Sequence, residues 1–136
     1  MKKVLAVAVD SRMGISFNGR ACSKDSAVLW RLIELAPDNQ VHSQRIPNGS
    51  SWQQEWGKCI DKGGVFYADL ESPKFMEHKF DRLHVICWNR EYPSDKKFHL
   101  DDGVWKKVGE KKYPGSSHKE ITETIYRRRK NKNGKV

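Results

Sequence analysis

The sequence is poor in cysteine and lacks the spacing that cysteine-based sites need. Its 136 residues include three cysteines, Cys22, Cys59 and Cys87, an odd number with no Cys-x-x-Cys pair. This pattern argues against a disulfide framework and against a structural zinc site. We expect three reduced, partly buried thiols.

Long hydrophobic runs are also missing. No apolar stretch approaches the roughly 18–20 residues that a membrane-spanning helix requires. Residues 1–9 begin like a signal peptide, but Asp10 ends the apolar stretch too early and no small-residue cleavage site follows. The sequence therefore predicts a soluble, cytoplasmic protein.

Motifs for nucleotides and metals are absent as well. The glycines form neither a G-x-G-x-x-G fingerprint nor a phosphate-binding P-loop. The five histidines form no H-x-H, H-E-x-x-H or H-x-x-x-H pattern, so no metal site is predicted. Asp10, at the end of an apolar run, could face a ligand or only cap a turn.

Positive charge is concentrated at the carboxyl end. The formal net charge is +9, and residues 127–136 hold six basic groups and no acid. Without them the chain has 20 basic groups against 17 acidic ones, so the body is only weakly basic. We predict one domain over residues 1–126 and a flexible basic tail over residues 127–136.

The first forty residues predict a strand, a loop and a helix. Residues 4–9 are a continuous apolar, β-branched run typical of a buried central strand. Residues 10–20 contain Gly14 and Gly19 and predict a loop. Apolar residues then recur at helical spacing between Ser23, a suitable N-cap, and Pro37, which ends the helix.

The rest of the chain is rich in predicted strands. We expect strands at residues 40–46, 65–70, 83–88, 104–108 and 120–126, and a short helix at residues 73–79. The last two strands would pair across a turn at residues 113–117, although Ser117 could instead begin a helix. The fold class is α/β, a mixed β-sheet flanked by a few helices.

Residues 8–19 also resemble a known family. They match the pattern Ala-x-Asp-x-x-x-Gly-Ile-x-x-Asn-Gly, which resembles the opening of dihydrofolate reductases. Asp25, with Leu29 four residues later, is similar to the acid and the apolar residue of that family's first helix. Looser similarity continues through Gly63-Gly64 and residues 81–86. The resemblance implies a shortened dihydrofolate-reductase-like fold.

The resemblance implies an activity and a set of site residues. NADPH would supply a hydride to a pterin or a related small molecule. The residues concerned are Asp25, which would orient the pterin; Ala8, Asn18, Gly19 and Leu29, which would contact the substrate or belong to the closing loop; and Arg45, Gly63 and Gly64, which would face the cofactor. Gln44 stands where the family has a cofactor-binding glycine.

Two other functions remain open on the sequence. A non-enzymatic protein could bind nucleic acid or a protein partner through Arg127, Arg128, Arg129 and Lys130. Trp52, Trp56 and Tyr92 would add exposed aromatic surface to such a binder. A small metal-independent nuclease could use His118 with Lys119 or Glu120 for acid–base chemistry, unless His118 is only a solvated turn histidine.

Overall fold

The computed structural model describes residues 3–36, 40–44, 59, 63–73 and 77–129. The elements, in chain order, are β1 Lys3–Val9, β2 Gly14–Phe17, β3 Arg20–Ala21, α1 Ser26–Leu35, β4 Val41–Ser43, β5 Gly64–Ala68, η2 Glu77–Lys79, β6 Arg82–Cys87, β7 Lys96–Lys97, β8 Trp105–Tyr113 and β9 Ile121–Arg128. Here η2 is a short 3₁₀-helix. Among the described residues, no helix has both the length and the hydrophobicity needed to cross a membrane.

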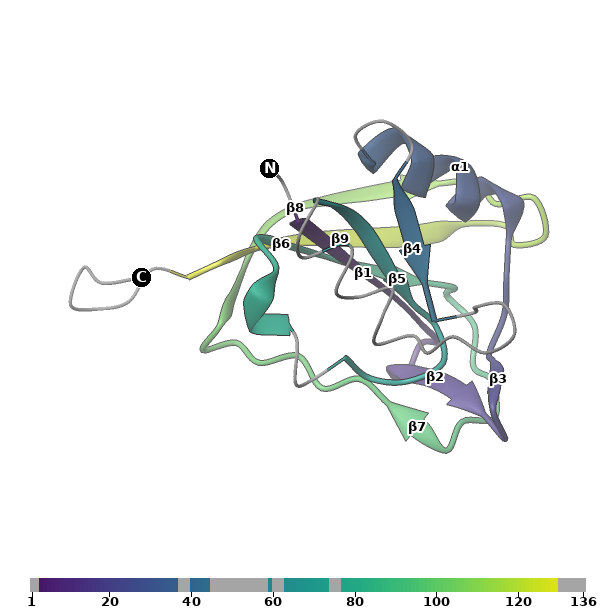
Figure 1. Cartoon of the computed structure of the whole chain (residues 1–136). Helices are drawn as coiled ribbons and strands as arrows, with labels where there is room; N and C mark the ends of the chain where they lie inside the picture. Colours follow the sequence, from purple (N-terminus) through teal and green to yellow (C-terminus); the bar gives the residue numbers. More distant parts are fainter. Residues whose placement is uncertain (1–2, 37–39, 45–58, 60–62, 74–76, 130–136) are drawn as a thin grey trace, which may run out of the picture.

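A six-stranded mixed sheet organises the molecule (Figure 1). Its strand order is β4-β5-β1-β6-β9-β8. The strands β4, β5, β1 and β6 run parallel, and β9 and β8 are added antiparallel. A small second sheet, β3-β2-β7, lies beyond the carboxyl ends of the parallel strands. The predicted α/β fold with a mixed sheet is confirmed.

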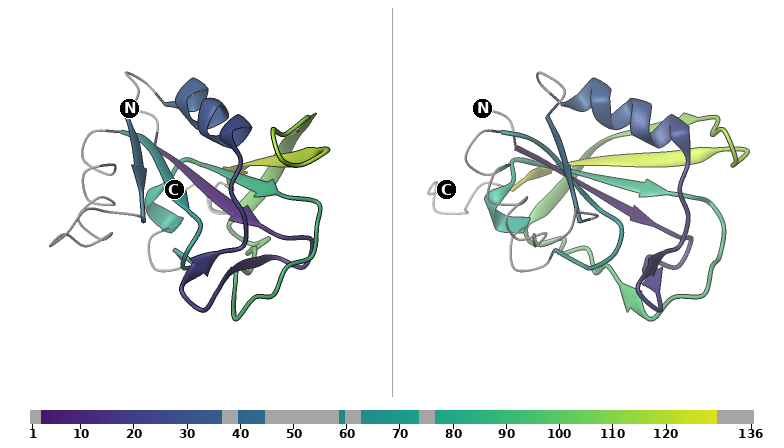
Figure 2. Two further views of the ribbon diagram at one scale, coloured as in Figure 1. Left: turned by 90° about the vertical axis from the view of Figure 1, so that its right-hand side faces the viewer. Right: turned by 45° about the vertical axis from the view of Figure 1, so that its right-hand side comes forward.

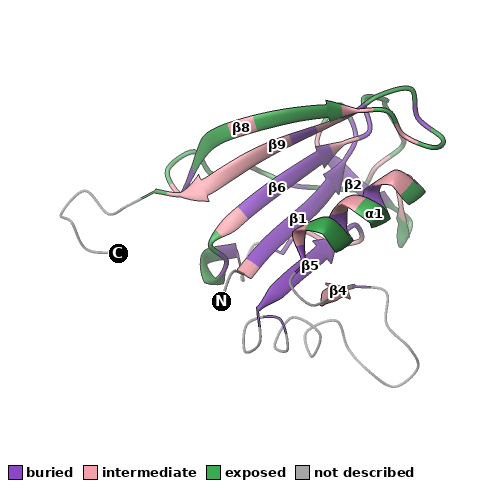
Figure 3. Cartoon of the chain, turned by 90° about the horizontal axis from the view of Figure 1, so that it is seen from above, coloured by how far each residue is buried: buried purple, intermediate pink, exposed green. Residues whose placement is uncertain are grey.

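The apolar run of β1 is continuous because both faces of this strand are covered. Leu5, Val7 and Val9 pack into one core cluster, and the alternate residues Val4 and Ala6 pack into the other. Helix α1 covers the second cluster through Val28 and Leu32, and Figure 2 shows it lying along that face of the sheet. Figure 3 shows β1, β5 and β6 buried and the edge strand β8 largely exposed.

The local predictions for α1 and its preceding loop need two corrections. Asp25, not Ser23, caps α1, because the Asp25 side chain accepts the backbone N–H of Ala27 at 2.8 Å. The predicted loop at residues 10–20 contains the strand β2, which pairs with β3 and β7. Asp10 accepts backbone N–H groups from Arg12 and Gly14, so it caps the β1–β2 turn.

The carboxyl-terminal hairpin was predicted correctly, and the helical alternative for its second arm is wrong. β8 and β9 pair antiparallel from Tyr113↔Ile121 to Trp105↔Arg128. β9 therefore includes Arg127 and Arg128, which the sequence assigned to a flexible tail. Of the predicted tail, only residues 127–129 lie within the described part of the chain.

The three thiols are free, as predicted. Cys59 is buried, and burial raises the pKa of its thiol to about 12. Burial also raises the pKa of Cys22 and that of Cys87. All three groups are therefore neutral thiols at neutral pH and poor nucleophiles.

Candidate functional site

The parallel strands end at a hollow between α1 and the small sheet. Ligands of open α/β sheets gather outside the carboxyl ends of the strands, because backbone groups and loop side chains converge there. Two adjoining cavities occupy this position, and Lys24 lines both of them.

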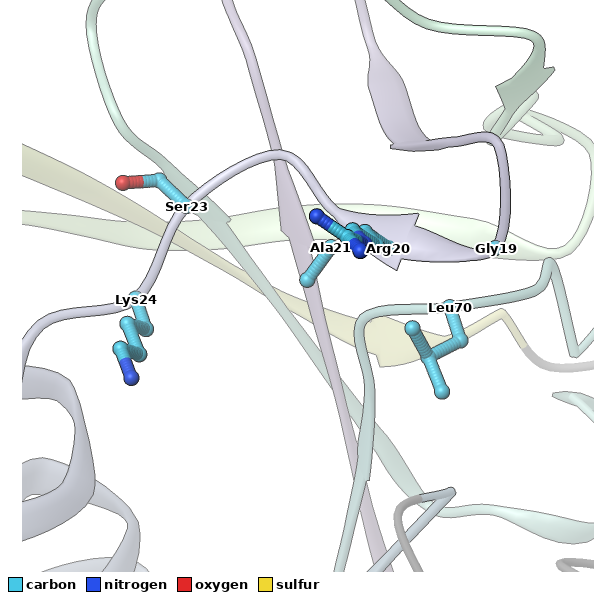
Figure 4. A pocket seen from close by; sticks show the side chains of 6 residues that line it. All are labelled: Gly19, Arg20, Ala21, Ser23, Lys24 and Leu70. Atoms are coloured by element: carbon cyan, nitrogen blue, oxygen red, sulfur yellow. The ribbon is translucent and has the colours of Figure 1, made fainter.

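The larger cavity has a volume of about 570 Å³. It lies against the segment that leads from β2 through β3 to α1, and Leu70, two residues after the end of β5, lines it from the other side (Figure 4). Its lining consists of Gly19, Arg20, Ala21, Ser23, Lys24 and Leu70. Arg20 and Lys24 are exposed cations, so this cavity favours a ligand with an anionic group.

The smaller cavity has a volume of about 320 Å³ and is mainly apolar. It lies between α1 and the ends of β4 and β5, and its lining consists of Lys24, Asp25, Val28, Leu29, Leu32, Val41, Ser43, Tyr67 and Asp69. An apolar wall with a few polar groups is typical of a site for a small organic molecule.

The Asp25 carboxylate is buried, and groups of this chain already occupy both of its oxygens. Oδ1 accepts the backbone N–H groups of Ala27 and Ser116, each at 2.8 Å. Oδ2 accepts the backbone N–H of Ser117 at 2.8 Å, the Ser117 hydroxyl at 3.1 Å and His118 Nδ1 at 2.8 Å. In this arrangement no lone pair of Asp25 is left for a pterin.

The turn between β8 and β9 packs closely on this carboxylate. Gly115 lies in this turn, next to Asp25. A Cβ atom at position 115 would stand 2.5 Å from Asp25 Oδ2 and 2.9 Å from the His118 carbonyl oxygen. Glycine is therefore required for the turn to reach Asp25.

His118 is buried, so the alternative of a solvated turn histidine is wrong. Its Nδ1 contacts Asp25, and its Nε2 lies 3.0 Å from Ser23 Oγ and 3.1 Å from the Tyr92 hydroxyl. The imidazole stacks on Trp88, with ring centroids 4.8 Å apart. These contacts join three segments that are far apart in the sequence, at residues 23–25, 88–92 and 118.

A second buried carboxylate, Glu123, fastens α1 to the sheet. It accepts bidentate hydrogen bonds from Arg31, at 2.9 and 3.1 Å from Nε and 2.9 Å from Nη2. His84 Nδ1 lies 2.7 Å from Glu123 Oε2, and the Tyr113 hydroxyl donates to Oε1 at 3.2 Å. Burial alone raises the pKa of Glu123, but the hydrogen bonds from His84 and Arg31 outweigh it and bring the pKa to about 2.

The lowered pKa values of Asp25 and Glu123 predict that the protein loses stability in acid. Burial alone raises the pKa of Asp25, but hydrogen bonds from His118 and three backbone N–H groups hold that pKa well below its ordinary value of 3.8. Because folding lowers both pKa values, the stabilisation is complete above the unfolded values of 3.8 and 4.5 and is lost as the pH falls below them toward the folded values. We expect the free energy of unfolding, measured by urea denaturation, to fall steadily from pH 5 to pH 2. A flat profile over this window would contradict both assignments.

The structure brings some of the predicted site residues together. Leu29 and Asp25 line the smaller cavity, and Gly19 lines the larger one. Asn18 lies beside Gly19 in the β2–β3 turn, where its N–H donates to Asp95 at 3.0 Å. Ala8 is buried in the core cluster beneath α1 and lines neither cavity.

The structure separates the predicted cofactor residues from this site. Gly64 pairs with Lys3 at the amino end of β5, whereas the cavities lie at the carboxyl end. Gly63 precedes Gly64 at the same end. A side chain at Gly64 would stand 2.6 Å from the Gln40 carbonyl oxygen, so this glycine serves close backbone packing. Arg45 lies outside the described residues.

Gln44 stands where the resemblance predicts a cofactor-binding glycine, and its side chain is hydrogen-bonded to the backbone of Leu70 and Glu71. Its side-chain oxygen accepts the N–H groups of Leu70 and Glu71 at 2.8 and 3.0 Å. Its side-chain nitrogen donates to the Glu71 carbonyl at 3.0 Å. These N–H groups, which follow the carboxyl end of β5, are therefore not available to a phosphate.

The residues proposed for nucleic-acid binding are partly committed to the fold. Arg128 donates to the carbonyl oxygens of Phe80 and Glu77. Arg129 donates to the Asp102 carbonyl at 2.6 Å. Arg127 pairs within the sheet, and Lys130, Trp52 and Trp56 lie outside the described residues. Lysines on the exposed edge strand β8 have a structural explanation, since charge there blocks edge-to-edge association.

Sequence reasoning missed the connection between Ser23, His118 and Asp25. It assigned Ser23 to a helix cap and His118 to a possible nuclease. Their 95- and 93-residue separations leave no local signal, because the β8–β9 turn meets the start of α1 only in the folded chain. No three His, Cys, Asp or Glu side chains of the described residues group as a metal site would require.

Comparison with solved structures identifies the fold. The chain is similar to a dihydrofolate reductase from Enterococcus faecalis complexed with NADP(H) and RAB-propyl, with a TM-score of 0.64 and 14% sequence identity. The match covers 92% of this chain and 95% of that chain. No family model matches the sequence, and no curated protein does. The fold is therefore dihydrofolate-reductase-like.

Proposed function

We propose that this protein binds an NADP-type dinucleotide in the larger cavity and uses it to reduce a small molecule in the smaller one. The observation that carries the proposal is the pair of adjoining cavities at the carboxyl ends of the parallel strands. Support comes from the fold, because the similar solved structure is a complex with NADP(H).

The lining of the larger cavity suits a phosphate-bearing nucleotide. Arg20 and Lys24 supply positive charge, and Ala21 and Leu70 supply apolar surface for a flat ring. Because Gln44 already uses the N–H groups of Leu70 and Glu71, side-chain cations must neutralise the phosphates. This differs from recognition by a glycine-rich loop.

The smaller cavity would hold the molecule to be reduced. A bound dinucleotide of this class supplies a hydride. The residues Val28, Leu29 and Leu32 provide an apolar wall that excludes water from the transfer. Asp25 would act here through the turn that it holds, since its oxygens are occupied.

The cations of the larger cavity provide the first test. We expect Lys24→Ala and Arg20→Ala each to weaken NADPH binding by about tenfold, because each would remove one charge-assisted contact to phosphate. The measurement is a titration with NADPH that follows quenching of tryptophan fluorescence. Lys106→Ala, which changes an exposed residue on β8 away from the cavity, is the matched control. Absence of quenching at millimolar NADPH in the unmodified protein would end the proposal.

A further inference from the structure

The start of α1 and the β8–β9 turn together form an ordered chain of polar groups. Ser23 Oγ lies 3.0 Å from His118 Nε2, and His118 Nδ1 lies 2.8 Å from Asp25 Oδ2. We infer that Ser23 is a nucleophile for acyl transfer, with His118 as its general base and Asp25 as the group that orients the imidazole. This activity goes beyond the proposed reduction and requires no dinucleotide.

The hydrogen-bond arrangement defines the protonation states that the chemistry needs. Asp25 is the acceptor at Nδ1, because its low pKa keeps it ionised. In the neutral imidazole the proton is therefore on Nδ1, and Nε2 presents a lone pair. That lone pair can accept the proton of the Ser23 hydroxyl, which is the role of the base in a Ser-His-Asp system.

The supporting groups are held rigidly. Three backbone N–H groups fix the Asp25 carboxylate, and stacking on Trp88 fixes the plane of the imidazole. Asp25 and His118 are buried, whereas Ser23 is half-buried. Of these three residues, Ser23 is the most exposed, which suits the role of the nucleophile.

Tyr92 supplies a donor next to the nucleophile. Its hydroxyl lies 3.5 Å from Ser23 Oγ and 3.1 Å from His118 Nε2. A hydroxyl at this position can donate to the oxyanion that forms when Ser23 attacks a carbonyl. The site therefore combines a nucleophile, a base, an orienting acid and a donor for the developing charge.

The surroundings indicate the substrate class. Ser23 lies at one margin of the larger cavity, and Figure 4 shows its hydroxyl directed away from Leu70, consistent with its bond to His118. The proposed attack requires a substrate carbonyl to enter at this margin, next to Lys24. The positive charge of Lys24 and Arg20 favours small esters that carry an anionic group.

The covalent steps use the ester and water alone. Ser23 Oγ forms a bond to the carbonyl carbon while its proton passes to His118 Nε2. The C–O bond to the alcohol then breaks, and the alcohol leaves with that proton, which produces acyl-Ser23. Water attacks the acyl group by the same route, releases the carboxylic acid and restores the Ser23 hydroxyl.

Covalent labelling with a fluorophosphonate tests the nucleophile directly. Ser23 attacks phosphorus, fluoride leaves, and His118 takes the serine proton. We expect intact-protein mass spectrometry to show one adduct, and peptide mapping to place it on Ser23. Ser23→Ala should abolish the adduct, whereas Ser26→Ala, a neighbouring exposed serine whose hydroxyl bonds to Ser116 rather than His118, should keep it.

Ester hydrolysis adds a readout that a merely structural network would not change. With 4-nitrophenyl acetate, we expect Ser23→Ala to remove turnover above background and Tyr92→Phe to lower it by about a hundredfold. Melting temperatures of the variants report any effect on folding.

Two outcomes overturn the inference. One is an unmodified protein that gains no adduct under conditions that label a known serine hydrolase. The other is an adduct that persists in Ser23→Ala or maps to another residue. Neither outcome bears on NADPH binding, so the two proposals fail separately.

Discussion

Replacing Glu123 by Ala is expected to lower the free energy of unfolding by about 3–5 kcal/mol. The Glu123 side chain is fully buried and accepts hydrogen bonds from Arg31, His84 and Tyr113. Its removal leaves the Arg31 guanidinium beside the sheet without its counter-charge and leaves two further groups without an acceptor. Urea denaturation monitored by circular dichroism measures the loss.

A matched control separates this buried network from ordinary surface charge. Glu120→Ala, three residues earlier and exposed, should change the free energy of unfolding by less than about 0.5 kcal/mol. If Glu123→Ala costs no more than Glu120→Ala, then Glu123 does not fasten α1 to the sheet.

Asp25→Ala is the second substitution with a large expected effect, about 3 kcal/mol or more of destabilisation. It removes the N-cap of α1, which is worth about 1 kcal/mol. It also leaves the N–H groups of Ser116 and Ser117 and His118 Nδ1 without acceptors. An unsatisfied polar group costs about 1–3 kcal/mol where it is buried, as His118 is. Thermal and urea denaturation measure the effect.

Asp95→Ala serves as the control for Asp25. Asp95 is exposed, and its side chain accepts one backbone N–H, that of Asn18, so a small effect is expected. If the two substitutions prove equal, the carboxylate does not hold the β8–β9 turn. A crystal structure of Asp25→Ala should show the turn displaced from the start of α1.

The hydrogen bonds of Asp25 show that the chain can share the fold of dihydrofolate reductases while its carboxylate serves another purpose. Asp25 stands at the expected place, at the start of the first helix. Its oxygens, however, bind the chain's own turn, and the smaller cavity adjoins it rather than opening onto free oxygens. A flat aminopyrimidine would have to displace that turn to reach Asp25. For the proposed reduction, this arrangement therefore favours a substrate held by apolar contact and by Lys24.

The local spacing of apolar residues was sufficient to predict the strands and helices that are defined by the faces they bury. The uniform apolar run of residues 4–9 predicted a strand covered on both sides, and β1 is central in the sheet. The helical spacing of Val28 and Leu32 predicted α1, whose buried face they form. The motif at residues 8–19, with Asp25, was enough to indicate the fold.

Local pattern could not assign the partners of polar groups. The sequence around Gly63 and Gly64 does not show whether this pair lies near the cavities or at the opposite end of the sheet. Only the register of β5 on β1 places Gly64 at the amino end of the parallel strands. A basic segment at the end of the sequence is typical of a flexible tail. Only the tertiary structure shows that β8 pairs with this segment as far as Arg127 and Arg128. Burial of apolar side chains follows a short-range periodicity that the sequence displays. A buried hydrogen bond depends on which distant segments meet, so only the tertiary structure decided what Asp25, His118 and Ser23 contact.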